Sequence, residues 1–189
     1  MQEVDRLGVS WGGYLSLRAA AFEPRIKRVT ALPAHFNGLD VALRQMFPGQ
    51  ARALVSLLHA EDRKGVEALV ADQRKFSTVF YWVITQGMHI IGTITPYDCL
   101  QAESRHQVRA FAHLVKQDVL LTAAEQDHLF PPECLEQEVH ALVCASSVTT
   151  RVFTAREGGK QHCQVGNSAL AMRQMINWLT LLRTAAGPP

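Results

Sequence analysis

The sequence predicts an α/β fold with a parallel sheet, because short apolar runs alternate with segments of helical periodicity along most of the chain. Each run is bounded by glycine, proline or charged residues, as buried strands usually are. Strands that alternate with helices are typical of a parallel sheet covered by helices. The expected strands, about four in number, are Val4–Val9, Ile26–Leu32, Val119–Ala123 and Thr149–Thr154.

The helices expected beside these strands carry clear end signals. Tyr14–Phe22 has helical spacing, and Pro24 ends it because proline removes a donor and clashes with the preceding turn. The prolines at 131 and 132 open a helix that runs to about Val143. Arg105–Lys116 is a further expected helix, and Ala169–Leu182 is a strong closing helix.

The pattern changes between residues 35 and 106, where helical segments follow one another without a strand. These segments are Leu39–Phe47, Ala51–His59 and Arg63–Arg74, followed by bulky apolar clusters at Tyr81–Ile84 and Met88–Ile91 and a break at Pro96. We therefore expect a helical insertion at 35–106 in a core made of residues 1–34 and 107–184. Residues 185–189 are expected to form a disordered tail.

Composition excludes several classes of protein. The chain has 189 residues, of which 48% are hydrophobic and 19% charged, so wholesale disorder is excluded. A net charge of +2 gives no electrostatic reason to expect nucleic acid or a membrane as a partner. The 4 cysteines form no C-x-x-C pair, which indicates a reduced, cytoplasmic protein. The polar start predicts no signal peptide, and no apolar run is long enough for a membrane span.

Ser10 lies in the pentapeptide Gly8-Val9-Ser10-Trp11-Gly12, between an expected strand and an expected helix. A nucleophilic serine needs this context, because a sharp strand-to-helix turn projects its hydroxyl into open space. Small residues on both sides let the backbone turn without a clash. The backbone N–H of Trp11 would then face a developing oxyanion. The alternative is a glycine-rich turn that only begins a helix.

A nucleophilic serine needs a base, and the base needs an acid that orients it. Asp127 follows the strand Val119–Ala123 and therefore lies at the carboxyl edge of the sheet, as does Ser10. Glu125 in the same loop is the competing acid, and Asp127 is preferred because it lies deeper in the loop. The alternative for Asp127 is a helix N-cap or a solvated loop charge.

His162 is the expected base, because it lies in a glycine-containing loop between the last strand and the closing helix. A flexible loop of this kind can bring the imidazole over the serine. The alternatives for the base are His35, His89, His106 and His128, and of these His35 also fits a place in the pocket. The histidines on expected helices, which are more typical of surface or packing positions, are His59, His113 and His140.

Three segments together resemble the α/β-hydrolase superfamily: Leu7–Tyr14, Leu121–His128 and Gly158–Asn167. They are most similar to its dipeptidyl-aminopeptidase or acylaminoacyl-peptidase-like branch, which contains polyketide-shortening and pseudooxynicotine C–C hydrolases. The resemblance implies that Ser10 is the nucleophile, His162 the general base and Asp127 its orienting acid. It implies a serine hydrolase that cleaves an ester, an amide or a ketone-adjacent C–C bond through an acyl-enzyme.

The family fold also implies that the insertion is a helical cap. Such a cap would wall the pocket and suit a small acyl or aromatic substrate, or its aromatic side chains would simply form its own core. The pocket candidates are His35, Phe36, Phe80, Tyr81, Trp82 and Met88.

No cofactor or metal is expected. Cys134, His140 and Cys144 fall at helical spacing but lack a fourth ligand, so we interpret them as packing residues. Cys163 follows His162 and fits the lining of the site, but a second nucleophile is not expected there.

Only 9 residues precede Ser10, whereas members of the family carry further strands and an oxyanion loop before the nucleophile. The resemblance therefore implies that the chain is the carboxyl-terminal part of a hydrolase, with an exposed sheet edge. An exposed apolar edge favours pairing with another chain. The alternative function is an inactive fragment that associates with itself, as a homodimer, or with a missing amino-terminal half.

Overall fold

The computed structural model describes residues 3–32 and 38–185, which fall into two compact units. One unit comprises Met1–Asn37 and Gln107–Pro189, and the other comprises Gly38–His106. Within the described residues, no helix combines the length and apolar character needed to cross a membrane. Each unit has its own apolar core.

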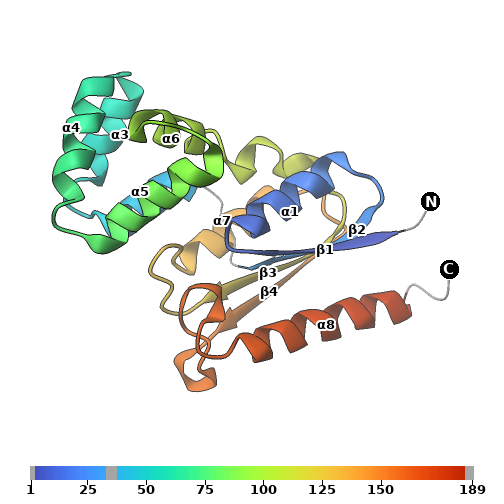
Figure 1. Ribbon diagram of the computed structural model, residues 1–189. Coiled ribbons are helices and arrows are strands. Elements are labelled where there is room, and N and C mark those ends of the chain that lie inside the picture. The colour runs from blue at the N-terminus through green and yellow to red at the C-terminus, as the bar shows by residue number, and fades with distance from the viewer. Residues whose placement is uncertain (1–2, 33–37, 186–189) are drawn as a thin grey trace. The chain divides into compact units, whose positions relative to one another are not determined.

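The first unit is built on a parallel sheet with the strand order β1-β2-β3-β4 (Figure 1). The strands are β1 (Val4–Val9), β2 (Ile26–Leu32), β3 (Asp118–Ala124) and β4 (Ser147–Phe153), and all three pairings are parallel. The predicted parallel α/β architecture is therefore confirmed. Because the carboxyl ends of all four strands meet at one edge, the loops that follow them also meet there.

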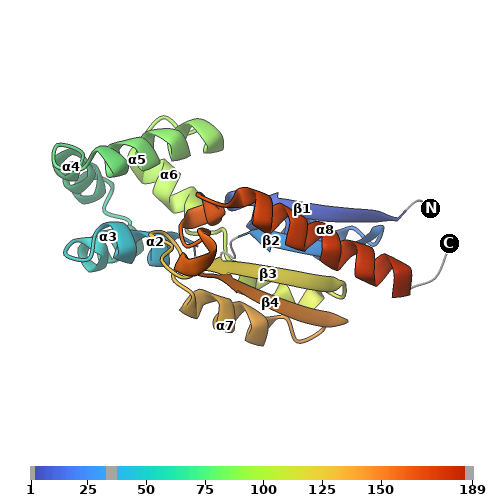
Figure 2. The same cartoon turned by 90° about the horizontal axis from the view of Figure 1, so that it is seen from below.

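Helices cover both faces of this sheet (Figures 1 and 2). α1 (Trp11–Phe22) and α7 (Glu133–Ala141) lie on one face, and α8 (Ser168–Ala185) lies on the other. On the first face, Leu17 of α1 belongs to the same buried cluster as Val119. On the second, Met175 of α8 packs with Phe153. β3 is buried at nearly every position because it has a strand on each side and a helical layer on each face.

The helix expected at Arg105–Lys116 is wrong. The segment instead forms two short 3₁₀ turns, η1 (Val108–Ala110) and η2 (Ala112–Leu114). A 3₁₀ turn places residues i and i+3 on one side, so the apolar spacing that indicated an α-helix is satisfied by this tighter conformation. Val108 and Phe111 are both buried in the sheet core as a result.

β1 is the edge strand of the described sheet, paired with β2 alone among the described residues. Its apolar side chains are correspondingly exposed: Val4 by 39%, Leu7 by 37% and Val9 by 45%. The same sheet therefore has one deeply buried strand, β3, and one strand whose apolar side chains meet solvent.

The second unit is wholly helical. Its helices are α2 (Gly38–Met46), α3 (Ala51–His59), α4 (Arg63–Gln73), α5 (Thr78–Ile91) and α6 (Pro96–Glu103). Leu54, Val66 and Phe80 belong to its buried core. The sequence pattern treated Pro96 as a break, but it is the first residue of α6, and Thr95 accepts a hydrogen bond from the Asp98 N–H as its N-cap.

Candidate active site

Ser10 stands at the turn between β1 and α1 with an unusual backbone conformation. Its φ is 54° and its ψ is −127°, values that a non-glycine residue rarely adopts. A conformation of this kind costs about 1–3 kcal/mol and persists only where its surroundings impose it. The Gly13 N–H donates to the Ser10 carbonyl oxygen over 2.8 Å, which closes the turn.

The glycines on either side of Ser10 are not equivalent. A Cβ added to Gly8 would lie 1.9 Å from the Gly12 carbonyl oxygen and 2.5 Å from Ser16 Oγ, so a side chain cannot fit there. A Cβ added to Gly12 would meet nothing within 4 Å. The expectation that both positions need a small residue is therefore correct for Gly8 and wrong for Gly12, which faces open space at the start of α1.

Three of the predicted site residues lie in a continuous row of contacts. Ser10 Oγ lies 3.0 Å from His162 Nε2. On the other side of the ring, His162 Nδ1 lies 2.9 Å from Asp127 Oδ2 and 3.1 Å from Asp127 Oδ1. Ser10 follows β1, Asp127 follows β3 and His162 follows β4, so the contacts join the loops at the carboxyl edge of the sheet.

The Asp127 side chain is completely buried. Its Oδ1 accepts hydrogen bonds from the N–H groups of Leu129 at 2.8 Å and Phe130 at 3.0 Å. Burial alone would raise the pKa of Asp127, but His162 and these two N–H groups outweigh it, so the pKa is lowered. Asp127 is therefore a carboxylate that both shapes its own loop and contacts the imidazole.

Glu125, the competing acid, has a different contact. Its side chain is on the exposed part of the same loop, and its Oε2 accepts a hydrogen bond from the Ala155 N–H over 2.6 Å. This contact ties the loop after β3 to the loop after β4. Glu125 thus binds the backbone of the segment that leads to His162, whereas Asp127 contacts the His162 ring itself.

The glycines of the loop that carries His162 predicted a flexible loop. The structure instead holds this loop by hydrogen bonds at several points. The Gln126 N–H donates to the Lys160 carbonyl oxygen over 2.8 Å, and Asn167 Nδ2 donates to the Glu157 carbonyl oxygen over 2.7 Å. The Glu157 carboxylate also accepts a hydrogen bond from the Thr154 N–H and forms an ion pair with Arg151. The imidazole therefore sits on a loop that is fixed at both ends.

His162 is only slightly exposed, with 15% of its side chain open to solvent. Burial favours the neutral ring, but the hydrogen bond and charge of Asp127, with contributions from Cys163, outweigh burial and raise the pKa of His162 to about 9. Two aromatic rings also lie against the imidazole. The ring centroid of His128 is 5.8 Å away, and that of Phe130 is 5.9 Å away.

Sequence reasoning weighed His128 only as an alternative base, and it missed Phe130 altogether. The available signal was their position, because both follow Asp127 within three residues, in a loop expected at the site. Trp11 is half-buried and is the first residue of α1, so its N–H lies at the N-terminus of that helix, beside Ser10.

The pocket candidates of the helical unit have separate environments. Tyr81 and Trp82 are exposed by 49% and 60%, whereas Met88 is half-buried and packs against the core of this unit. Phe80 is buried and makes an edge contact with Phe47, with ring centroids 3.9 Å apart, so it belongs to that core rather than to a pocket wall. His35 and Phe36 lie outside the described residues.

The cysteines are all free thiols. Burial raises the pKa of Cys134 to about 11 and that of Cys99 to about 12, so neither is a ready thiolate. His140 and Cys144 are exposed. Within the part of the chain that the structure describes, no group of three or more His, Cys, Asp or Glu side chains could hold a metal ion.

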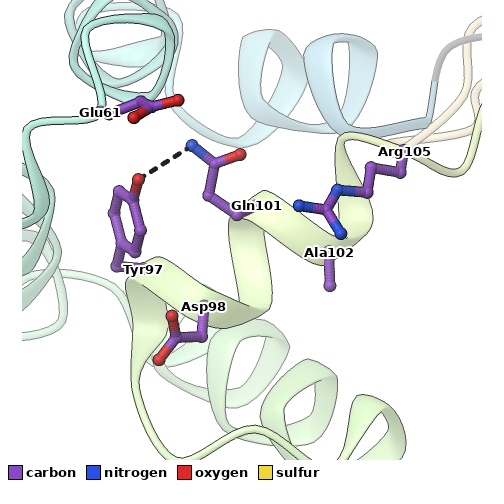
Figure 3. A pocket seen from close by; sticks show the side chains of 6 residues that line it. All are labelled: Glu61, Tyr97, Asp98, Gln101, Ala102 and Arg105. Atoms are coloured by element: carbon purple, nitrogen blue, oxygen red, sulfur yellow. Dashed lines mark hydrogen bonds between the residues drawn. The ribbon is translucent and has the colours of Figure 1, made fainter.

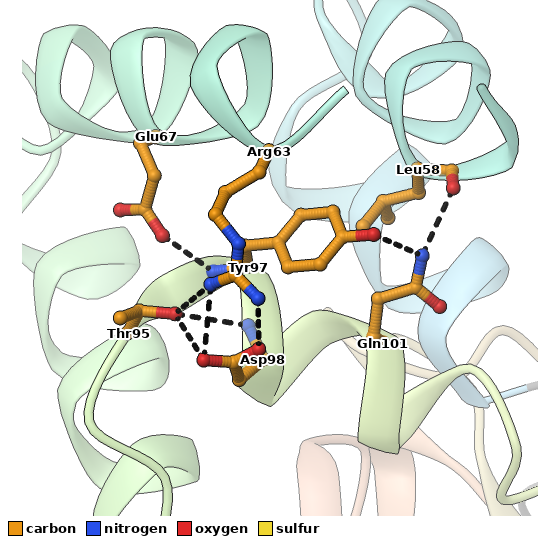
Figure 4. Close-up of polar contacts among 7 residues, drawn as sticks. All are labelled: Leu58, Arg63, Glu67, Thr95, Tyr97, Asp98 and Gln101. Carbon is orange, nitrogen blue, oxygen red and sulfur yellow. Dashed lines mark hydrogen bonds and ion pairs between the residues drawn. The ribbon is translucent and has the colours of Figure 1, made fainter. Parts of the chain in front are cut away.

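A polar hollow of about 340 Å³ lies in the helical unit (Figure 3). Its lining residues are Glu61, Tyr97, Asp98, Gln101, Ala102 and Arg105. Several of these side chains already bind one another or adjacent residues (Figure 4). Asp98 forms an ion pair with Arg63, and Gln101 Nε2 donates to Tyr97 Oη and to the Leu58 carbonyl oxygen. The hollow therefore borders a network that joins α3, α4 and α6.

Comparison with curated proteins finds relatives that are named hydrolases. No family model matches the chain. It is 28% identical to Hydrolase LUC6 of Fusarium sp, over 94% of this chain and 43% of that protein. It is 25% identical to Hydrolase acrC of Aspergillus aculeatus, over 95% of this chain and 42% of that protein. The chain thus spans less than half the length of the curated relatives it matches.

Comparison with solved structures supports the fold. An esterase of Pyrococcus furiosus matches 96% of this chain and 54% of its own with a TM-score of 0.60 and 12% identity. A proline iminopeptidase of Mycobacterium smegmatis matches 100% of this chain and 68% of its own with a TM-score of 0.57 and 18% identity. The chain has the α/β-hydrolase fold, and its described residues form an open sheet of four strands.

Proposed function

We propose that this protein is a serine hydrolase that works through an acyl-enzyme. The observation that carries the proposal is the row of contacts from Ser10 Oγ through the His162 ring to the Asp127 carboxylate. A hydroxyl is a weak nucleophile by itself, and an imidazole within hydrogen-bond reach can take its proton as it attacks a carbonyl carbon. The names of the curated relatives, which are hydrolases, agree with this proposal.

Each residue of the row has one role in the proposed reaction. His162 Nε2 takes the proton of Ser10 as Oγ bonds to the substrate carbonyl carbon, and it later returns that proton to the leaving group. Asp127 holds the proton on Nδ1 and stabilises the imidazolium that forms. The Trp11 N–H donates to the oxyanion at the start of α1. Water, activated by the same imidazole, then releases the acyl group from Ser10.

The proposed substrate has an apolar acyl or aromatic group, and the scissile bond is an ester, an amide or a ketone-adjacent C–C bond. The support comes from α5 of the helical unit, which we propose acts as a cap that selects the substrate. Val79, Trp82 and Ile90 are exposed by 53%, 60% and 56%, and their spacing puts them on one side of this helix. Exposed apolar patches of this kind mark binding surfaces more often than isolated apolar residues do.

A fluorophosphonate probe tests the proposed nucleophile. We expect the probe to modify Ser10, located by peptide mapping, and we expect no modification of the Ser10→Ala variant. Ser56→Ala is the matched control, because Ser56 is an exposed serine on α3. Labelling that persists in folded Ser10→Ala, or the absence of labelling in a folded unmodified sample, would contradict the proposal.

A second candidate function is association without catalysis, and the exposed strand β1 favours it. Leu7 and Val9 are exposed on an edge strand, and Leu15 of α1 and Ile176 of α8 are exposed by 50% and 54%. Apolar side chains are therefore exposed on the edge strand and on a helix of each layer, as at surfaces that another chain covers.

The occupant proposed for this edge is a strand of another chain, either a second copy or a different polypeptide. A second copy pairing antiparallel about a two-fold axis at Arg6 would oppose like charges, which is destabilising, whereas an axis at Leu7 would oppose two apolar side chains, so both occupants fit this edge. Light scattering during size-exclusion chromatography tests this candidate. A monomer that is labelled at Ser10 would favour the enzyme, and a self-associated, unlabelled protein would favour association.

A further inference from the structure

The His162 ring needs more than its two hydrogen bonds to stay in a productive orientation. The contacts at Nε2 and Nδ1 are 3.0 Å to Ser10 and 2.9 Å to Asp127. The ring is also tied to the backbone through its Cβ–Cγ bond, and small rotations about that bond move both nitrogens out of line with their partners. Hydrogen bonds weaken when the donor or acceptor turns away from the plane in which it is directed. A side chain packed against the ring limits these rotations.

His128 is placed to do so. Its ring meets the His162 ring edge to face, with centroids 5.8 Å apart and an angle of 73° between the ring planes. Phe130 makes a second, tilted contact at 5.9 Å and 41°. Phe130 is buried, whereas His128 is exposed, so His128 is the partner that borders solvent beside the imidazole.

The backbone around His128 is itself fixed. Asp127 Oδ1 accepts the N–H groups of Leu129 and Phe130, which turns the chain tightly on both sides of His128. The carboxylate that contacts His162 therefore also sets the position of the ring that lies against His162. One side chain, Asp127, aligns the imidazole directly and through its neighbour.

We propose that His128 is a positioning residue that holds the His162 ring in the plane required for proton transfer from Ser10. This proposal rests on the proposed serine hydrolase function. The role belongs to an aromatic ring at position 128 and not to the acid–base chemistry of an imidazole. An edge contact of this kind is worth about a twofold to tenfold effect in an equilibrium or rate.

Two variants separate these alternatives. His128→Ala removes the ring, and His128→Phe keeps an aromatic ring without the imidazole nitrogens. We expect His128→Ala to lower the maximal rate of Ser10 phosphonylation by about twofold to tenfold, with the half-saturating probe concentration unchanged. We expect His128→Phe to restore the rate. His113→Ala is the matched control, because His113 is an exposed histidine of the same unit, and it should react like the unmodified protein.

The ring of His162 supplies a readout that does not depend on catalysis. In ¹⁵N-histidine NMR spectra, His128→Ala should shift and broaden the His162 ring signals, and His128→Phe should return them to a single sharp set. Unchanged labelling and unchanged spectra in folded His128→Ala would overturn the proposal. A His128→Phe variant as slow as His128→Ala would also overturn it, because the imidazole itself would then be required. If unmodified protein is not labelled at Ser10, the proposed function fails, and the NMR comparison still decides whether His128 holds the ring.

Discussion

The two sides of the candidate site are built in different ways. Asp127 and His162 follow β3 and β4, and their loops are joined by several hydrogen bonds around buried side chains. Ser10 follows the edge strand β1, with a φ of 54° and exposed apolar residues just before it. Many contacts therefore hold the side chains of Asp127 and His162 in place, whereas the position of Ser10 depends on one tight turn after the edge strand. One site thus combines a half that is held by many contacts with a half that depends on local backbone strain.

The largest expected effect on the labelling rate comes from a substitution of Asp127, in the half of the site that is held by many contacts. Asp127→Asn should lower the phosphonylation rate of Ser10 by about 10,000-fold, because the amide favours the wrong tautomer of His162 and cannot stabilise the imidazolium. Stopped-flow or timed labelling measures this rate. Glu125→Gln is the control, since the side-chain oxygen can still accept the Ala155 N–H and does not contact the imidazole. Equal losses in the two variants would show that the loop, and not the carboxylate of Asp127, is what matters.

The next largest effect is expected on the stability of the strained turn around Ser10. Gly8→Ala should destabilise the fold by about 3 kcal/mol or more, because its Cβ would overlap the Gly12 carbonyl oxygen. Gly12→Ala should be neutral or up to about 1 kcal/mol stabilising, since its Cβ meets open space and alanine favours the helix. Urea denaturation of both variants measures the free energy of unfolding. Similar losses at both positions would mean that the turn does not have this geometry.

The charge of His162 affects both the reactivity of Ser10 and the contact with Asp127, so the labelling rate and the stability should both depend on pH. The base must be neutral to take the proton of Ser10, so labelling should become faster as pH rises towards the His162 pKa of about 9. Stability should move in the opposite direction. Because the pKa of His162 is raised above its ordinary value of 6.5, the contact with Asp127 contributes fully below pH 6.5 and is lost as pH rises through about 9.

Both trends are checked by measuring the rate of Ser10 labelling and the free energy of unfolding between about pH 6 and pH 10. This histidine is expected to change charge in about that range. Asp127→Asn serves as the reference, because the rise of the labelling rate with pH should then occur at lower pH. If the rise occurs over the same pH range in Asp127→Asn, a group other than His162 controls the rate.

The smallest effect is expected at the edge strand. Leu7→Thr should change the free energy of unfolding by no more than about 0.5 kcal/mol, because Leu7 is already partly in solvent. Val29→Thr is the buried comparison on β2, where an inserted hydroxyl should cost about 1–3 kcal/mol. Thermal and urea unfolding measure both. A large loss in Leu7→Thr would show that the edge is covered in solution.

Local pattern was enough to predict most of the fold. The strands Val4–Val9 and Ile26–Leu32 have the predicted bounds, and α3 spans the predicted Ala51–His59. These elements carry apolar runs and end signals that do not depend on distant residues. The turns at Val108–Ala110 and Ala112–Leu114 were missed because α and 3₁₀ spacing bury the same residues. α6 was missed because a proline begins a helix as readily as it ends one.

The sequence by itself determined the order of the strands and of most helices, and the chain positions of Ser10, Asp127 and His162, because these depend on periodicity and on turn residues close by. Only the tertiary structure decided that the three side chains meet. The contact between Ser10 and His162 joins residues 152 positions apart, and its geometry depends on how four strands align. It also decided that Glu125 ties two loops and that His128 lies against the imidazole. Such contacts arise from the packing of distant segments, which no local pattern encodes.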